Sequence, residues 1–142
     1  MEPTTKNVEE HFAQITPAKR QADARTLAAL LTEITGASPV LWSGNIVGFG
    51  ECRYRYPTGR EGLSPILGFA ARKPSITVYL LDGVEQHTES LAGLGPHETG
   101  KGCLYLKDVG AADQSALRRL LAESARRVLS NEIPGVQFDI TD

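Results

Sequence analysis

The sequence is poor in cysteine and contains no long apolar stretch. Its two cysteines, Cys52 and Cys103, lack the CxxC spacing of redox and zinc sites. We expect both to remain thiols in a reducing cytosol, where disulfides are rare. The longest apolar runs, such as the one around residues 79–81, are far shorter than the roughly 20 residues that cross a bilayer. The first residues also lack the charged and apolar segments of a secretory signal, so a cytoplasmic location is expected.

The chain also lacks an excess of charge of either sign. There are 15 Lys and Arg residues against 17 Asp and Glu residues, which gives a net charge of −2. No strong overall field therefore attracts nucleic acid or an anionic membrane, and neither is expected as a partner. Hydrophobic residues make up 41% and charged residues 23% of the chain, as in typical globular proteins. The length of 142 residues suits one domain that covers residues 1–142.

Apolar residues at helical spacing predict four helices. Asn7 is expected to cap the first helix, and Thr16 with Pro17 to begin the second, which Gly36 ends. Asp113 is expected to cap the last helix, whose apolar side chains form a continuous stripe. The predicted helices cover residues 8–15, 17–35, 84–94 and 114–130.

Segments rich in β-forming residues predict an antiparallel sheet, because short turns join them. The predicted strands cover residues 46–56, which residues 40–42 lead into, and residues 64–71, 75–81 and 102–107. The tail, residues 131–142, contains a segment over residues 133–140 in which apolar and polar side chains alternate. We expect the tail to form either an extra edge strand or a flexible end. Such a strand either folds back on its own sheet or pairs with a second copy of the chain, as a homodimer. We therefore predict an α+β fold, a single two-layer domain with helices packed on an antiparallel β-sheet of four or five strands.

Residues 95–101 carry a pattern that resembles a nucleotide-binding loop. The segment Gly-Pro-His-Glu-Thr-Gly-Lys has the G-x-x-x-x-G-K spacing of the Walker A motif. Gly102 stands where the motif requires Ser or Thr, and the segment follows a predicted helix and precedes a strand, the reverse of a P-loop. We interpret the match as accidental, with Lys101 left as a local contact for an anion.

The residues that serve metals and catalysis do not form a recognisable pattern. His11, His87 and His97 lie in three separate segments, with no ligand spacing between them or the cysteines. No cofactor is predicted from these residues, and any metal ligands remain unknown. There is no G-x-S-x-G motif and no base at a characteristic distance from a nucleophile, so a non-enzyme is favoured over an unrecognised enzyme. Five acidic residues would form either a weak surface for hard cations or ordinary solvated helix faces, namely Glu9, Glu10, Asp23, Glu85 and Glu89.

Aromatic and basic residues gather in the strand-rich middle of the chain. Tyrosine rings offer contact area, and guanidinium groups bind carboxylate or phosphate with two hydrogen bonds. This combination predicts a non-catalytic binding module for a small anionic ligand or a protein partner, although the same residues also occur as ordinary sheet and turn residues. The predicted ligand-binding residues are Trp42, Arg53, Tyr54, Tyr56, Arg72, Lys73, Tyr79, Lys101 and Tyr105.

Several segments of the middle region, in order, resemble those of a known family. They are Trp42 with Ile-Val-Gly-Phe-Gly at 46–50, Tyr-Arg-Tyr at 54–56, Gly-Arg-Glu-Gly at 59–62, Gly-Phe-Ala-Ala-Arg-Lys at 68–73, Thr-Val-Tyr-Leu at 77–80 and Thr-Gly-Lys-Gly-Cys-Leu-Tyr-Leu-Lys at 99–107. On these segments the chain resembles the YdhG-like domain of unknown function family (DUF 1801), up to about residue 130. The resemblance implies a small intracellular α+β domain with no agreed catalytic residues. It also implies an alternative function, since a frataxin-like iron chaperone role is proposed for some members.

Overall fold

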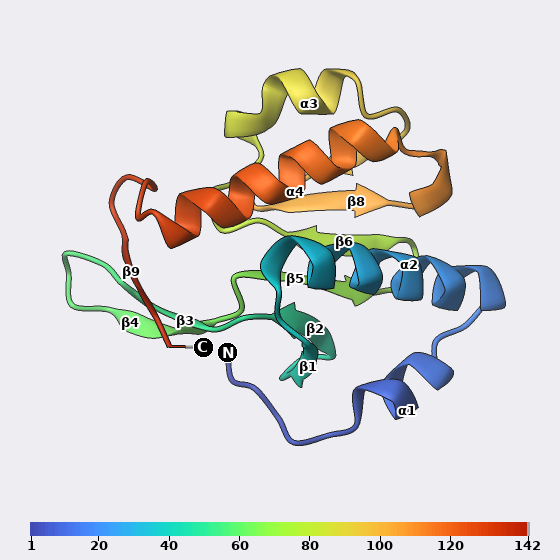
Figure 1. The fold of residues 1–142 in the computed structure, drawn as a ribbon, viewed down its shortest axis with the longest axis horizontal. Coiled ribbons are helices and arrows are strands. Elements are labelled where there is room, and N and C mark those ends of the chain that lie inside the picture. Colours follow the sequence, from blue (N-terminus) through green and yellow to red (C-terminus); the bar gives the residue numbers. More distant parts are fainter. Residues whose placement is uncertain (142) are drawn as a thin grey trace.

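The structure is a computed structural model that describes residues 1–141, and Figure 1 shows its elements. The helices are α1 (Val8–Ala13), α2 (Ala18–Thr35), α3 (Thr88–Ala92) and α4 (Gln114–Leu129), with the 3-10 turns η1 (Glu85–His87) and η2 (Val109–Ala111). The strands are β1 (Pro39–Trp42), β2 (Ile46–Phe49), β3 (Cys52–Arg55), β4 (Glu61–Ser64), β5 (Leu67–Ala71), β6 (Ile76–Tyr79), β7 (Glu98–Thr99), β8 (Cys103–Leu106) and β9 (Gln137–Ile140).

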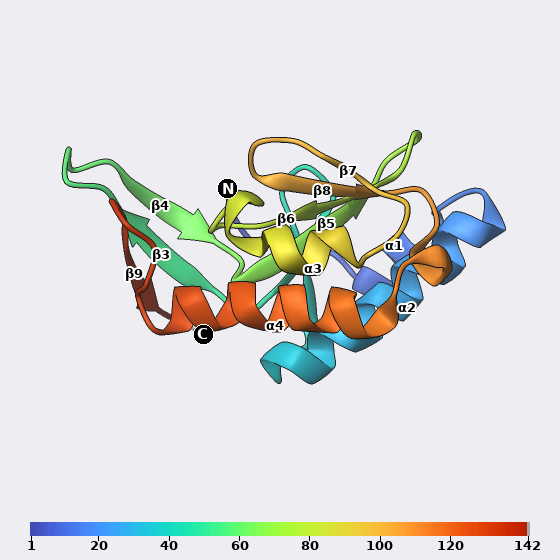
Figure 2. The same ribbon diagram turned by 90° about the horizontal axis from the view of Figure 1, so that it is seen from above.

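The strands form two antiparallel sheets, and the predicted α+β class is confirmed. One sheet has six strands in the order β1-β2-β5-β6-β8-β7, and the other has three in the order β4-β3-β9. There are more strands than the sequence predicts, because two of the expected strands divide and β7 adds a short edge. The tail forms β9 and pairs with β3 of its own chain. We call the three-stranded sheet the arm, since it extends from one end of the molecule (Figure 2).

The arm exists because the expected strand over residues 46–56 breaks at Gly50. Gly50 has a φ of +74°, a backbone conformation that favours glycine, and a Cβ there would collide with the side chain of Ile66. In the partner segment, Pro65 separates β4 from β5. The two breaks lie opposite each other, since the Ile66 amide donates to the Phe49 carbonyl. The chain therefore passes from one sheet to the other at this point.

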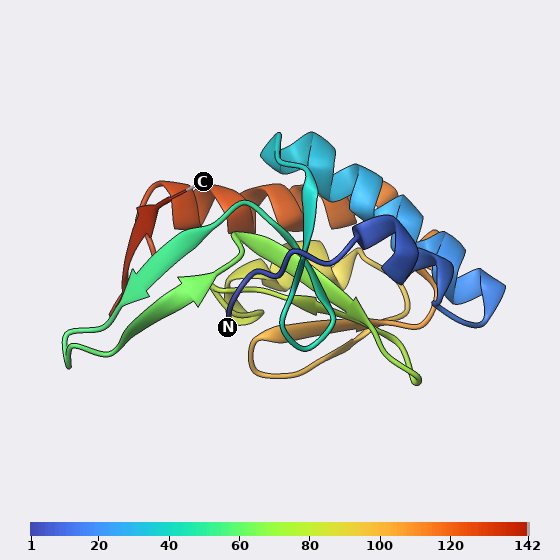
Figure 3. The ribbon, with the colours of Figure 1, turned by 90° about the horizontal axis from the view of Figure 1, so that it is seen from below.

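The core lies between the six-stranded sheet and the two long helices. Strand register aligns Leu41, Val47, Phe69, Val78 and Leu104 in one row across five strands, and all of these side chains are buried. Both α2 and α4 lie on the side of the sheet that this row faces, and no helix of residues 1–141 lies on the other side (Figures 2 and 3). Burying each such side chain contributes about 1.5–3 kcal/mol to folding. On the opposite face, Trp42, Ile46 and Ala70 form a small second buried cluster.

The helix ends follow the predicted capping residues with one exception. Asn7 accepts a hydrogen bond from the Glu10 amide at 2.9 Å, and Asp113 caps α4 in the same way. Gly36 ends α2 with a φ of +72°. The prediction for the start of α2 was wrong: Pro17 is the N-cap, and no side chain of the preceding residue caps the helix. The helix expected over 84–94 is divided into η1 and α3.

Candidate functional site

The helix-free face of the six-stranded sheet carries several of the predicted binding residues. Register places Ala70, Thr77 and Tyr105 in one row across β5, β6 and β8. Tyr79 lies in the adjacent row, beside Cys103. Both tyrosines are half-buried, so each ring packs on the sheet and keeps an accessible part. This face therefore combines aromatic contact area with solvent access.

Trp42 lies on this face but offers almost no surface, because only 2% of it is exposed. Its indole lies against Gly48, where a Cβ would collide with Trp42 Nε1 and with the Pro65 side chain. The segment before α1 runs beside β1, with Pro3 bridged to Trp42 (Figure 3). Among the predicted binding residues, Trp42 thus acts as a packing residue.

The largest pocket lies at one end of the helix-free face, and we call it the sheet pocket. Its volume is about 680 Å³, within the range of about 300–1,000 Å³ typical of small-molecule sites. It lies between the turn before β6, the strands β7 and β8, and η2. Its polar lining includes Ser75, His97, Glu98, Tyr105 and Lys107, together with Asp108. Pro74, Pro96 and Ala111 supply apolar surface.

Charged groups of both signs surround the sheet pocket, and two of the lysines have no acidic partner in the described part of the chain. Lys107 lines it, and Lys73 directly precedes the lining residue Pro74. Neither lysine has a carboxylate within ion-pair distance among residues 1–141. Asp108 is paired with Lys19, whose Nζ lies 2.9 Å from Asp108 Oδ1 and 2.8 Å from Asp23 Oδ2, and the hydrogen bond from Lys19 holds the pKa of Asp108 below its ordinary value. Glu98 is the remaining acidic residue of the lining.

Tyr105 and His97 add directional polar groups to this pocket. Hydrogen bonding with the Cys103 thiol raises the pKa of Tyr105, so its hydroxyl stays protonated and can donate. His97 Nδ1 lies 2.8 Å from the Gly95 carbonyl, an acceptor, which places the proton on Nδ1 and leaves Nε2 as an acceptor. Sequence reasoning missed His97 and Ser75. Their loops meet Tyr105 only through the pairing of β6 and β7 with β8.

Arg72 connects the sheet pocket with the centre of the helix-free face. It directly follows β5, and its amide donates to the Ser75 carbonyl at 3.0 Å. Its guanidinium donates to the Tyr79 hydroxyl at 3.3 Å. The predicted residues Arg72, Tyr79 and Tyr105 therefore lie on one face, and Lys73 lies in the turn between β5 and β6. Lys101 lies in the turn between β7 and β8, at the opposite end of these strands from Lys107.

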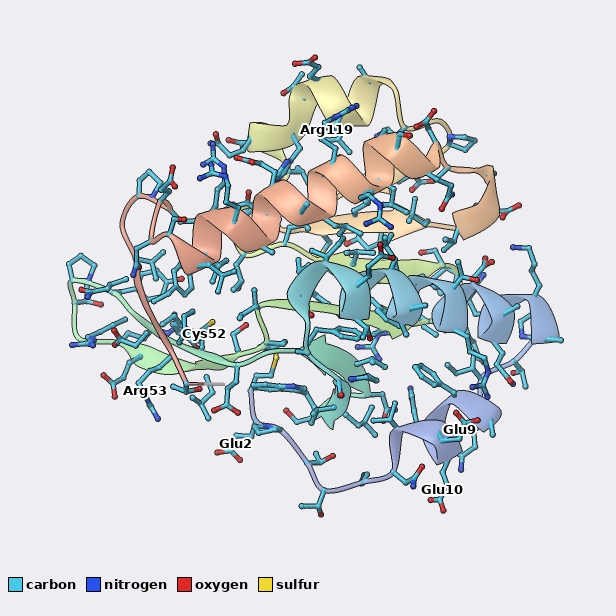
Figure 4. All side chains as sticks on the ribbon, in the orientation of Figure 1. Glu2, Glu9, Glu10, Cys52, Arg53 and Arg119 are labelled. Carbon is cyan, nitrogen blue, oxygen red and sulfur yellow. The ribbon has the colours of Figure 1, made fainter. Side chains whose placement is uncertain are left out.

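Tyr54 and Tyr56 belong to the arm and line a smaller pocket of about 250 Å³, which we call the arm pocket. The rest of its lining consists of Met1, Arg60, Leu63, Ser64, Leu81, Val136 and Phe138. Arg53 lies on the other face of the arm and points away from the molecule in Figure 4. Its guanidinium pairs with Glu61 at 3.6 Å. The nine predicted residues are thus divided between two pockets and other positions.

A buried polar network joins the segment after β6 to α4. Asp82 accepts a hydrogen bond from Ser124 Oγ at 2.6 Å, and its other carboxylate oxygen lies 2.7 Å from His87 Nε2. These three side chains are almost completely buried. Asp82 lies between Ser124 and His87, so the imidazole does not contact the hydroxyl as a catalytic base would. The network therefore fastens this segment to α4.

The acidic residues considered for cation binding do not form one surface. Glu9 and Glu10 lie on α1, whereas Glu85 and Glu89 belong to η1 and α3 on the opposite side of the molecule (Figure 1). Glu9 is paired with Arg25 at 2.8 Å. Figure 4 shows Glu9 and Glu10 at the outer surface of α1. Within residues 1–141, no group of three or more His, Cys, Asp or Glu side chains is arranged to hold a metal ion.

The two cysteines are free and lie in different environments. Cys52 is fully buried where the arm begins, and burial raises the pKa of its thiol to about 12. It is therefore neutral and unreactive at physiological pH. Cys103 is half-buried on the helix-free face. Among residues 1–141, no helix is both long and apolar enough to cross a membrane.

Comparisons with known proteins do not add a family to this description. No family model matches the chain, and no curated protein or solved structure shows significant similarity to it. The resemblance to the YdhG-like family stays a prediction. The function must therefore be inferred from the two pockets themselves.

Proposed function

We propose that the protein is a non-catalytic binding module for a small organic anion, which occupies the sheet pocket. The observation that carries the proposal is the combination of a pocket of about 680 Å³ with unpaired cations at its border. The pocket is large enough for a metabolite-sized molecule, and Lys107 and Lys73 would attract an anionic group. The size of the pocket and the charge of these lysines support binding, and neither points to a chemical reaction.

The rest of the lining defines which anions suit the pocket. Ser75 and Tyr105 offer hydroxyl donors, which suit the several acceptor oxygens of a phosphate or carboxylate group. The Pro74 and Pro96 rings would contact the carbon part of the ligand. Asp108 opposes an anion less than a free carboxylate would, because it shares the charge of Lys19 with Asp23. A dianion with a small organic group fits this set of donors best.

The proposal is tested by titrating the protein with three anions, phenyl phosphate, glycerol 3-phosphate and succinate, and following backbone amide signals by NMR. We expect at least one anion to shift the amide signals of Ser75, His97 and Lys107. Phenol and glycerol, which lack the charge, are expected to bind at least about tenfold more weakly, since a charge-assisted hydrogen bond contributes about 1.5–3 kcal/mol. The double variant Lys73→Gln/Lys107→Gln is expected to lose the preference for anions.

Lys6→Gln is the matched control, since Lys6 is an exposed lysine before α1. This variant should bind the anions as the unaltered protein does. The proposal fails if none of the three anions shifts these amides at up to about 10 mM, a concentration that would saturate a site with a Kd near 1 mM. It also fails if the Lys73/Lys107 double variant binds with unchanged affinity.

A further inference from the structure

The two faces of the arm differ in how their arginines are paired. Because side chains alternate along a strand, Arg53 and Arg55 of β3 share one face, and Tyr54 lies on the other. Arg53 pairs with Glu61, and Arg55 pairs with Asp139 of β9 at 2.5 Å. Both arginines of the first face are therefore neutralised by carboxylates of the neighbouring strands.

The arginine of the second face has no such partner. The Tyr56 amide donates to the Arg60 carbonyl at 2.8 Å, which places Arg60 opposite Tyr56 at the end of the β3–β4 hairpin. Arg60 lines the arm pocket with both tyrosines, and no acidic side chain is among the lining residues. No carboxylate of residues 1–141 lies within ion-pair distance of Arg60. Arg60 thus brings an uncompensated positive charge to the arm pocket.

Aromatic and apolar side chains form the rest of this pocket. The rings of Tyr54 and Tyr56 meet edge to face with their centroids 5.8 Å apart. Tyr54 extends over Gly62 of β4, where a Cβ would collide with the tyrosine hydroxyl. Phe138 is buried at the base of the pocket, whereas Tyr56 is 42% exposed. The pocket therefore has an apolar floor and an aromatic rim beside the Arg60 guanidinium.

From this arrangement we infer that the arm pocket binds a small aromatic carboxylate. A planar guanidinium binds a carboxylate with two parallel hydrogen bonds, and the tyrosine rings favour an aromatic ring in offset or edge-on contact. The volume of about 250 Å³ suits a ligand with one ring. The arm pocket also differs from the sheet pocket in its lining, which within residues 1–141 has two tyrosines and no acidic side chain, whereas Glu98 and Asp108 line the sheet pocket. The two sites share no lining residue, so this inference does not depend on the proposed function.

The inference is tested by titrating the protein with 4-fluorobenzoate and following both the ligand fluorine signal and the protein amide signals. We expect saturable binding that shifts the amides of Tyr54, Tyr56 and Arg60. 4-Fluorobenzamide and acetate, which lack the charge and the ring respectively, should each bind at least about tenfold more weakly, because a charge-assisted hydrogen bond contributes about 1.5–3 kcal/mol and an aromatic pair about 0.5–1.5 kcal/mol beyond area burial. Arg60→Gln should weaken 4-fluorobenzoate binding at least tenfold and leave 4-fluorobenzamide binding unchanged.

Arg53→Gln is the matched control, because Arg53 lies on the same sheet but on its other face. This variant and Lys107→Gln, in the sheet pocket, should bind 4-fluorobenzoate with unchanged affinity. Thermal melts of Arg60→Gln should match those of the unaltered protein, since Arg60 is exposed. The inference is overturned if 4-fluorobenzoate does not bind, if Arg60→Gln binds it normally, or if the shifted amides surround the sheet pocket instead.

Discussion

At the scale of single residues, Asp82 shows how one buried carboxylate can join distant segments. Its side chain is 1% exposed and contacts both Ser124 of α4 and His87 of η1. Arg127 lies nearby, with its Nε 3.8 Å from Asp82 Oδ2. A buried carboxylate is stable only when donors surround it, because losing water costs several kcal/mol. Asp82 therefore stabilises the fold through the groups that it pairs.

Replacing Asp82 tests this role. Asp82→Ala leaves the buried Ser124 hydroxyl and His87 ring without an acceptor, so we expect the free energy of unfolding to fall by about 3–5 kcal/mol. Asp82→Asn keeps one acceptor oxygen for Ser124 and should lose less, about 1–3 kcal/mol. Chemical denaturation followed by circular dichroism measures both values. If both variants were as stable as the unaltered protein, the hydrogen bonds of Asp82 would contribute nothing to stability.

His11 is a half-buried polar residue whose hydrogen-bonding groups are less well satisfied. Its Nε2 atom is buried without a hydrogen-bond partner, and burial lowers the pKa of the ring below its ordinary value of 6.5. The folded state therefore binds a proton less readily than the unfolded state does. The neutral His11 ring therefore makes its full contribution to the stability of the fold above pH 6.5. This contribution is lost as the pH falls below that value and the ring becomes protonated.

Because folding lowers the pKa of His11, we expect the folded protein to be less stable in mild acid. We expect the Tm to decrease between about pH 7.5 and pH 5.5, and His11→Leu to reduce this decrease because the leucine does not titrate. His97→Gln serves as the control, since His97 lies in the distant loop before β7. Differential scanning calorimetry at the two pH values compares the three proteins. A decrease in Tm that is the same with and without His11 would contradict the assignment.

At the scale of elements, glycines decide how closely side chains approach the sheet. Gly48 of β2 and Gly68 of β5 are register partners on the helix-free face. The Trp42 indole occupies the space above Gly48, and Ile46 and Pro65 approach Gly68. This packing closes one end of the face and leaves the sheet pocket at the other. The glycines therefore help to place the binding surface on β6 and β8.

A methyl group at Gly48 tests this packing. In Gly48→Ala the new Cβ collides with Trp42 and Pro65, so we expect a loss of about 1–3 kcal/mol in the free energy of unfolding and a changed tryptophan emission spectrum. Gly93→Ala is the matched control, because a Cβ at Gly93 meets no atom within 4 Å. Equal stability of both variants would mean that the indole moves away at no cost.

At the scale of the whole molecule, one free edge of the arm is blocked by a side chain. The Asn131 amide group donates to the Phe138 carbonyl at 2.8 Å and accepts from the Phe138 amide at 2.6 Å. It occupies the position that a further strand would take beside β9. Exposed strand edges pair readily with other chains, and proteins commonly protect them. A homodimer through β9, which the alternating tail suggested, would have to displace Asn131.

Asn131→Gly removes this protection and tests its importance. Asn131 has a φ of +56°, which glycine adopts easily, so the substitution removes the two hydrogen bonds without straining the backbone. We expect a loss of about 1–2 kcal/mol relative to Asn45→Gly, a control at the similar φ of +60°. Size-exclusion chromatography with light scattering should show more self-association at high concentration for Asn131→Gly alone. Identical elution of both variants at all concentrations would contradict the protective role.

The sequence by itself determined the features that depend on neighbouring residues. The α+β class, the caps at Asn7 and Asp113 and the glycine end of α2 follow from periodicity and local hydrogen bonding, and they are confirmed. The predicted binding residues include the tyrosines that line the two pockets but neither Lys107 nor Arg60, and the prediction did not assign the tyrosines to one pocket or the other. It could not do so, because a pattern along the chain carries no information about pairing between distant strands.

Only the tertiary structure decided which of these residues meet. The break at Gly50 turned one predicted strand into two, and that break separated Tyr54 and Tyr56 from Tyr105. Pairing between strands neutralised Arg53, and the hairpin end left Arg60 beside the tyrosines without a carboxylate. Packing against Gly48 buried Trp42, whose ring the sequence had suggested for ligand contact. These outcomes depend on contacts between residues far apart in the chain, which is why the binding surfaces appear only in the folded molecule.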